Sequence, residues 1–158
     1  MKKFKVIAME ESLAQSIRHT MKDEFGNALI SVITNGTGPC RQCLQPFERG
    51  KDERILFAYQ PIKSKSPYTE VGPVYIHTHH CKSYADENEF PAAIKNDRKN
   101  FPLTLRCYNH EERMIYAELV GERNPEEVIE QLFERPEIEF LHARNSEYGC
   151  FIAKIERP

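Results

Sequence analysis

The sequence has 158 residues, of which 40% are hydrophobic and 29% are charged, so it is too apolar for a disordered chain and is expected to form one domain with a single core. The formal net charge is −2, with +3 on residues 1–79 and −5 on residues 80–158. Neither half carries the strong positive charge that general nucleic-acid binding requires. No apolar run approaches the length of a membrane span, and the run at residues 6–9 is too short for a signal peptide.

These features predict a cytoplasmic protein that neither crosses a membrane nor binds nucleic acids in general. The five cysteines are an odd number, and in a reducing compartment they are expected to be thiols or metal ligands rather than a disulfide framework. The sequence does not identify a partner, and it leaves a homo-oligomer open.

The first half of the chain is predicted to contain one helix among extended segments. Leu13, Ile17 and Met21 recur every fourth residue, which is the pattern of an amphipathic helix, over residues 10–25. Compact apolar or β-branched runs predict strands at residues 4–9, 28–34 and 54–61. A fourth segment, residues 74–81, is expected to be extended.

The second half of the chain carries clearer local signals. Asn124 and Pro125 suit the N-cap and first position of a helix that Pro136 stops. A shorter helix is expected at residues 90–97, and strands are expected at four places: residues 103–108, 113–119, 138–143 and 149–156. About eight strands and three helices, without βαβ alternation, predict an α+β fold with a mostly antiparallel sheet and flanking helices.

Two cysteines stand two residues apart in "GPCRQCL", inside a stretch without periodicity at residues 35–53. A C-x2-C turn delivers two thiolates to one zinc ion, which prefers sulfur and imidazole ligands in a tetrahedron. In "HTHHC" an extended strand would point His77, His79 and Cys81 to one side. The sequence therefore predicts a binding module with a structural zinc site formed by Cys40, Cys43, His77 and Cys81. The metal would also order the long loop.

Other interpretations of these residues stay open. The cysteines can be incidental, since small buried thiols are common. Thiol redox chemistry is a further option, although residues 44–47 do not continue as the helix that usually supports a reactive thiolate. A small enzyme of unknown reaction is the third option. Its pocket would lie between residues 60–72 and the C-terminal strands, where Arg144 would hold an anion. The residues of this pocket would be Arg41, Tyr68, His142 and Arg144.

Single residues outside the proposed metal site have simpler interpretations. His142 alternates with Ile138 and Phe140, which favours a semi-buried histidine with satisfied hydrogen bonds over a catalytic base. Cys107 and Cys150 lie in apolar strands and are predicted to be core residues.

Three blocks of the sequence, in this order, resemble the DUF1203 family of uncharacterised bacterial proteins: "GPCRQCL…GKDERILFAYQP", "PYTEVGPVYIHTHHC" and "RPEIEFLHARNSEYGCFIAKIERP". The resemblance runs from about residue 28 to the C-terminus and implies a single bacterial domain without an assigned activity. It also implies that relatives carry serine at the position of Cys43, so that the full ligand set belongs to a subgroup. A function common to the family would then lie with other residues: Cys40, Arg41, Tyr68, Arg144 and Cys150.

Overall fold

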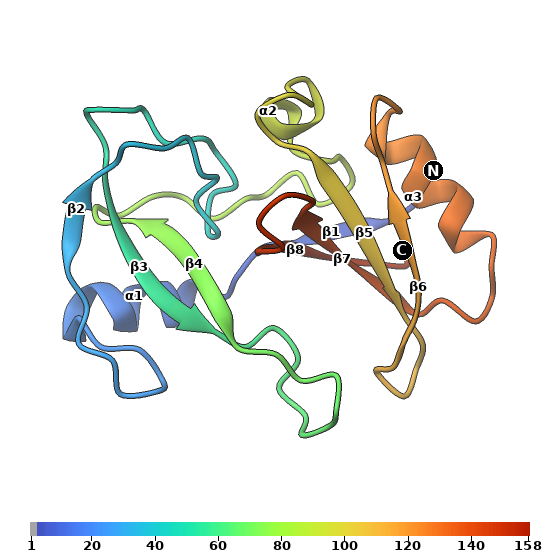
Figure 1. Cartoon of the computed structure of the whole chain (residues 1–158), viewed down its shortest axis with the longest axis horizontal. Coiled ribbons are helices and arrows are strands. Elements are labelled where there is room, and N and C mark those ends of the chain that lie inside the picture. The colour runs from blue at the N-terminus through green and yellow to red at the C-terminus, as the bar shows by residue number, and fades with distance from the viewer. Residues whose placement is uncertain (1–2) are drawn as a thin grey trace. The chain divides into compact units, whose positions relative to one another are not determined.

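A computed structural model describes residues 3–158 of the chain (Figure 1). The chain forms two compact units. The described part of the first unit comprises residues 3–7, 66–68 and 85–158, and the second unit comprises residues 8–65 and 69–84. Together they contain eight strands and three helices, which confirms the predicted α+β fold with antiparallel pairing.

The first unit is built on a five-stranded antiparallel sheet in the order β1-β8-β7-β5-β6. Its strands are β1 (Lys5–Ile7), β5 (Leu103–Tyr108), β6 (Met114–Leu119), β7 (Phe140–Asn145) and β8 (Phe151–Glu156). Two helices belong to the same unit: α2 (Ala92–Lys95) and α3 (Pro125–Phe133). The short segment between Tyr108 and Met114 joins β5 to β6 as a hairpin.

The longer of these helices begins as the sequence predicts and is closed by a distant arginine. The Asn124 side chain accepts a hydrogen bond of 2.9 Å from the backbone N–H of Glu126, so it caps the N-terminus of α3. At the other end, Arg157 donates to the carbonyl oxygens of Phe133, Arg135 and Ile138. The bond to Phe133 satisfies a carbonyl at the C-terminus of the helix, and the other two bonds hold the segment that follows it.

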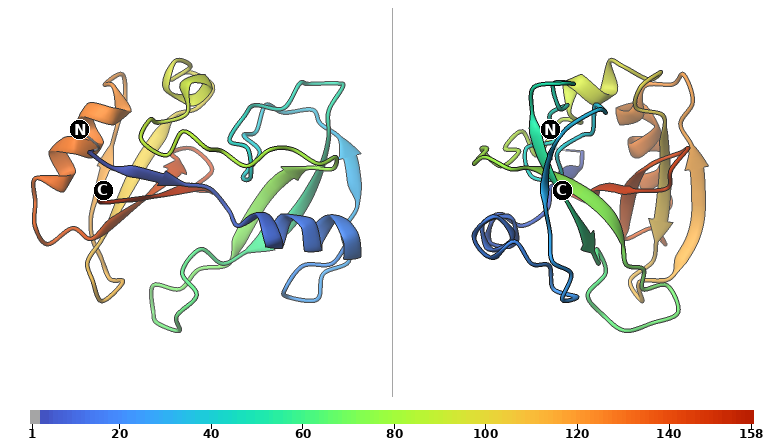
Figure 2. Two further views of the ribbon diagram at one scale, coloured as in Figure 1. Left: turned by 180° about the vertical axis from the view of Figure 1, so that it is seen from behind. Right: turned by 60° about the vertical axis from the view of Figure 1, so that its left-hand side comes forward.

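The second unit contains a three-stranded antiparallel sheet in the order β2-β3-β4 and one helix. Its elements are α1 (Glu11–Thr20), β2 (Ser31–Ile33), β3 (Glu53–Tyr59) and β4 (Gly72–His77). Figure 2 shows the sheet and helix from two further directions. None of the helices in residues 3–158 is long and apolar enough to cross a membrane.

Three elements of the second unit are shorter than the sequence patterns predict. The helix ends at Thr20 because Met21 has a left-handed backbone with φ of 51° and donates its N–H to Ile17. The strand expected over residues 28–34 forms only at 31–33. The extended segment expected over residues 74–81 ends at His77, so Cys81 lies beyond β4 in irregular backbone.

Candidate metal centre

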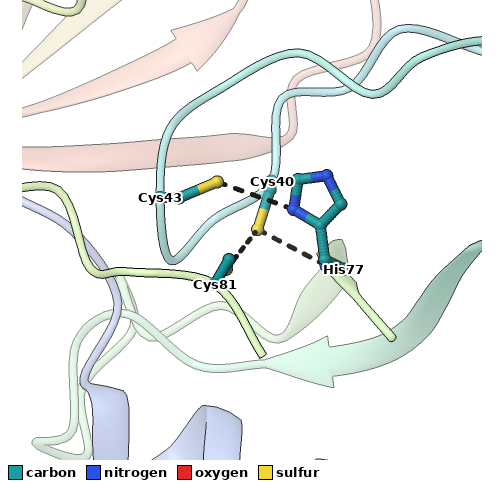
Figure 3. Close-up of side chains that lie close together, drawn as sticks. All are labelled: Cys40, Cys43, His77 and Cys81. Atoms are coloured by element: carbon teal, nitrogen blue, oxygen red, sulfur yellow. Dashed lines mark hydrogen bonds between the residues drawn. The ribbon is translucent and has the colours of Figure 1, made fainter. Parts of the chain in front are cut away.

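Cys40, Cys43, His77 and Cys81 form one cluster in the second unit (Figure 3). Their ligand atoms all lie within 4.8 Å of one another. The Sγ atoms of Cys40 and Cys81 are 3.9 Å apart, and Cys43 Sγ is 3.6 Å from His77 Nδ1. Ligands about 2.3 Å from a tetrahedral zinc ion are separated by about 3.8 Å, so these distances fit one ion.

The two cysteines of the C-x2-C pair are held by a tight turn in the loop before β3. The Leu44 N–H donates to the Cys40 carbonyl at 2.8 Å, and the Cys40 N–H donates to the Gln45 carbonyl at 3.0 Å. Leu44 itself has a left-handed φ of 57°. This local hydrogen bonding places both thiols on the same side of the turn, as Figure 3 shows.

Backbone N–H groups are directed at the sulfurs of this turn. Cys40 Sγ accepts from the N–H of His77 at 3.4 Å and from the N–H of Cys43, and Cys43 Sγ accepts from the N–H of Gln45. Such donors stabilise the thiolate form over the thiol. The thiolate is the form that binds metal ions, so the turn is prepared for coordination.

The loop that carries the cysteines has no regular secondary structure from Asn35 to Asp52, yet much of it is buried. Leu44 is fully buried and Phe47 nearly so, and the Phe47 ring contacts the His77 ring edge-on with centroids 4.6 Å apart. Gly38 makes this packing possible. It has φ of +93°, and a Cβ added there would lie 2.4 Å from the Phe47 ring.

Cys81 reaches the cluster from a segment that Gln42 holds in place. Gln42 is fully buried between the two loop cysteines, and its Nε2 donates to the Cys81 carbonyl and to Ser83 Oγ, both at 3.1 Å. The N–H of Tyr84 donates to the Gln42 carbonyl at 3.0 Å. These hydrogen bonds fix the position of Cys81, the fourth residue of the cluster, independently of a metal ion.

Hydrogen bonds within the cluster shift the pKa values of Cys40, Cys43 and His77. Hydrogen bonds from Cys43 and Cys81 hold the pKa of Cys40 well below its ordinary value, whereas the hydrogen bond with Cys40 raises the pKa of Cys43. Burial lowers the pKa of His77, but hydrogen bonds with Cys40 and Cys81 outweigh it and raise the pKa to about 10. Several thiolates in one site require a proton or a cation among them.

The imidazole of His77 is held from its far side by a carboxylate. His77 Nε2 is 3.4 Å from Asp52 Oδ2, while Nδ1 faces the cysteines. Asp52 also accepts from the Glu48 N–H at 2.6 Å; this bond and the charge of His77 lower the pKa of Asp52. A carboxylate on the second nitrogen of a ligating histidine fixes the ring orientation and raises its basicity.

The sequence prediction selected the four clustered residues but misjudged their surroundings. His79 was expected beside His77 and Cys81 on a continued strand, but β4 ends at His77. His79 is exposed, and its ring is tilted against that of His77 with the centroids 4.8 Å apart. Sequence reasoning also missed Arg18, Gln42 and Asp52. Gln42 lies inside the C-x2-C motif and could have been noted, whereas Arg18 and Asp52 carry no spacing signal.

The residues predicted to line an anion pocket belong to both units. Arg41 lies in the second unit, is almost fully buried, and donates to the Pro39 carbonyl. Tyr68, His142 and Arg144 lie in the first unit. Arg144 donates to the Gly149 carbonyl at 3.0 Å, and Tyr68 is 37% exposed. The pocket stays a prediction.

His142 is more deeply buried than the sequence predicts. It is 1% exposed, its ring packs against Tyr108, Phe140 and Phe151, and its Nδ1 has no hydrogen-bond partner within residues 3–158. Burial, together with Arg144 and other nearby cations, lowers its pKa to about 3. The imidazole is therefore neutral at ordinary pH, and the expectation that its hydrogen bonds are satisfied is wrong for Nδ1.

The two remaining cysteines lie in the first unit. Cys107 is buried in β5 as predicted, and burial raises the pKa of its thiol to about 12. Cys150 was predicted to be a core residue, but it precedes β8 and is only half-buried. Among residues 3–158, no second group of three metal-ligating side chains accompanies the cluster around Cys40.

The comparison with protein families gives one match. The family model described as "Protein of unknown function (DUF1203)" matches residues 37–157, which include all four residues of the cluster and exclude α1. The searches of curated proteins and of solved structures found no match. Because the family model covers most of the chain, the chain belongs to the DUF1203 family.

Proposed function

We propose that this chain is a binding module that holds one zinc ion through Cys40, Cys43, His77 and Cys81. The observation that carries the proposal is the convergence of four ligand atoms within 4.8 Å, from two chain segments more than 30 residues apart. Backbone N–H groups aimed at the sulfurs and a carboxylate behind His77 support it.

The donor set favours zinc over the common hard cations. Thiolate and imidazole are soft or borderline ligands, whereas calcium and magnesium require oxygen ligands. Three sulfurs and one nitrogen also match the ligand composition of familiar structural zinc sites.

A structural role follows from the number and burial of the ligands. Four protein ligands complete the tetrahedron and leave no position for a substrate or a reactive water. Cys40, Cys43 and His77 are buried, with exposed fractions of 0%, 8% and 6%. The ion would connect the irregular loop before β3 to the end of β4, so its binding free energy would contribute to folding.

The test is metal analysis of protein purified without a histidine tag from a reducing cytoplasm, where we place the chain. We expect one zinc per chain, and we expect cobalt substitution to give the sulfur-to-metal charge-transfer and visible bands of a tetrahedral site. Zinc well below one per chain, with the three cluster thiols titrating freely before and after chelation, contradicts the proposal.

Thiol redox chemistry is the second candidate, and one distance favours it. Cys40 Sγ and Cys81 Sγ are free and only 3.9 Å apart, so they can approach to form a disulfide. The same preparation, purified without a histidine tag, separates the candidates. A disulfide that forms and is reduced reversibly near the cytosolic glutathione potential, in a chain that does not bind zinc, would favour redox chemistry.

A further inference from the structure

One arginine on α1 contacts three parts of the metal centre at once. Arg18 Nε donates to the His77 carbonyl at 2.9 Å, Nη1 donates to Gln42 Oε1 at 2.7 Å, and Nη2 donates to Cys81 Sγ at 3.4 Å. Each nitrogen of the guanidinium therefore has its own acceptor. Two of the acceptors belong to proposed ligands, and the third lies between the other two ligands.

The helix is placed so that this side chain must face the cluster. Arg18 stands in the last turn of α1, next to Ile17, whose side chain is 1% exposed in the core of the unit. Arg18 is itself half-buried, and its acceptor Gln42 is fully buried. A planar guanidinium with three fixed acceptors is held in one orientation.

The positive charge of Arg18 offsets the negative charge of the metal-loaded centre. Three thiolates and one divalent ion carry a net charge of −1, and Asp52 adds a further negative charge at His77. Arg18 is a cationic side chain with a hydrogen bond to a sulfur of the cluster. A charge-assisted hydrogen bond lowers the electron density on the sulfur that accepts it.

The hydrogen bond from Arg18 acts on the most exposed sulfur of the cluster, that of Cys81. Cys40 and Cys43 are buried, whereas Cys81 is half-exposed and is the thiolate that a reagent in solution can reach. A metal-bound thiolate in an over-charged site is a nucleophile, and a donor on its lone pair weakens that reactivity.

We infer that Arg18 is a positioning residue of the metal centre, which neutralises and orients the Cys81 thiolate and keeps the bound thiolate unreactive. The inference rests on the proposed zinc binding. It assigns a role to the N-terminal helix, which lies outside the region that the family model matches, residues 37–157. The centre in this chain is therefore completed by a helix that the family match does not include.

The experiment measures the reaction of the zinc-loaded full chain with iodoacetamide. The Cys81 sulfur forms a bond to the reagent carbon and iodide leaves, so the rate at this residue reports its nucleophilicity. Mass spectrometry of the Cys81 peptide gives the rate, and half-exposed Cys150 in the other unit provides an internal reference. Cobalt-loaded protein gives the energy of the charge-transfer band as a second readout.

The main variant is Arg18→Gln, which removes the charge but keeps an N–H donor. We expect zinc to stay near one per chain while Cys81 reacts about tenfold faster, as loss of a charged hydrogen bond implies. The cobalt charge-transfer band should shift, and Cys150 should react at an unchanged rate. Lys22→Gln, which removes a positive charge from an exposed residue just after α1, should match the wild type.

The outcomes separate this inference from the zinc proposal. A wild-type chain without zinc overturns both, whereas a zinc-loaded Arg18→Gln chain with wild-type Cys81 reactivity and spectrum overturns only the role of Arg18. If Arg18→Gln does not fold, Arg18→Lys decides, because it keeps the charge. Cys81 reactivity within about threefold of the wild type supports charge neutralisation, and a tenfold increase contradicts it.

Discussion

Asp52 and His77 form the contact that orients the only nitrogen ligand of the cluster: Asp52 Oδ2 lies 3.4 Å from His77 Nε2. The opposite ring nitrogen, Nδ1, faces Cys43 Sγ at 3.6 Å. A neutral imidazole with its proton on Nε2, facing the carboxylate, has the lone pair of Nδ1 available for a metal ion. The contact therefore selects the tautomer that can coordinate.

Asp52→Asn should weaken zinc binding without destroying the site. The amide keeps an oxygen for the Glu48 N–H, which Asp52 accepts at 2.6 Å, but it loses the charge that supports His77. We expect zinc affinity to fall by about 10- to 100-fold, as measured by competition with a chromogenic chelator. Glu48→Gln, which changes an exposed neighbouring carboxylate, is the control and should leave the affinity unchanged.

Cys43→Ser should remove zinc and lower thermal stability together. Serine keeps the size of the side chain but lacks the thiolate, so the tetrahedron cannot close. Because metal-binding free energy is also folding free energy, we expect the melting temperature to fall by roughly 10 °C. Chelator should lower the wild type to the same value and leave the variant unaffected.

Cys150→Ser is the matched control for that substitution, since Cys150 is a half-buried thiol in the other unit. It should retain one zinc per chain and the chelator-sensitive melting temperature. A Cys43→Ser chain that melts at the wild-type temperature would instead show that the loop is held by its own packing.

The fold was largely predictable because its elements have strong local periodicity. The stripe of α3 and its Asn124 cap define a helix from sequence alone, and they are found in the structure. The length of a strand is harder to predict. Alternation of side chains does not say where pairing stops. β4 ends at His77, and the chain bends at Thr78 after a last bond from its N–H to the Glu53 carbonyl.

The metal ligands were predictable from residue type, and their supporting residues were not. The C-x2-C spacing indicates a zinc site whatever the fold is, because it delivers two thiolates to one ion. Arg18 lies 63 residues from Cys81 in the sequence, and Asp52 lies 25 residues from His77. Such contacts depend on how the helix and loop pack in the second unit, which no local pattern encodes.

Gly38→Ala should destabilise the loop through two separate effects. The residue has φ of +93°, where an L-amino acid is strained, and the new Cβ would lie 2.4 Å from the Phe47 ring. Phe47 packs on His77, so its displacement should disturb a ligand. We expect a loss of roughly 1–3 kcal/mol in unfolding free energy and a measurable fall in zinc affinity.

Gly50→Ala separates the two effects of that substitution. Gly50 also has a positive φ, of +78°, but a Cβ there would meet nothing within 4 Å. It should show the cost of backbone strain with unchanged zinc affinity. Equal zinc affinities in the two variants would mean that the contact between Phe47 and Gly38 does not position His77.

His142 should make the stability of the first unit depend on pH. Burial lowers its pKa from 6.5 to about 3, so between these values the unfolded chain binds a proton that the folded chain does not. The contribution of the neutral His142 to the free energy of unfolding is therefore fully present above pH 6.5, and it is lost as the pH decreases towards 3. Each unit of pKa shift corresponds to about 1.4 kcal/mol, so the total loss from this one group should be a few kcal/mol.

His142→Phe should flatten this dependence, because phenylalanine does not titrate and suits the surrounding rings of Tyr108, Phe140 and Phe151. The measurement is the difference in unfolding free energy between variant and wild type, followed from pH 7 to pH 5 in denaturant titrations. Taking the difference removes the contributions of other histidines and of metal loss, since both proteins share them. The difference should move in favour of the variant as the pH falls; a constant difference would mean that His142 stays accessible to protons in the folded chain.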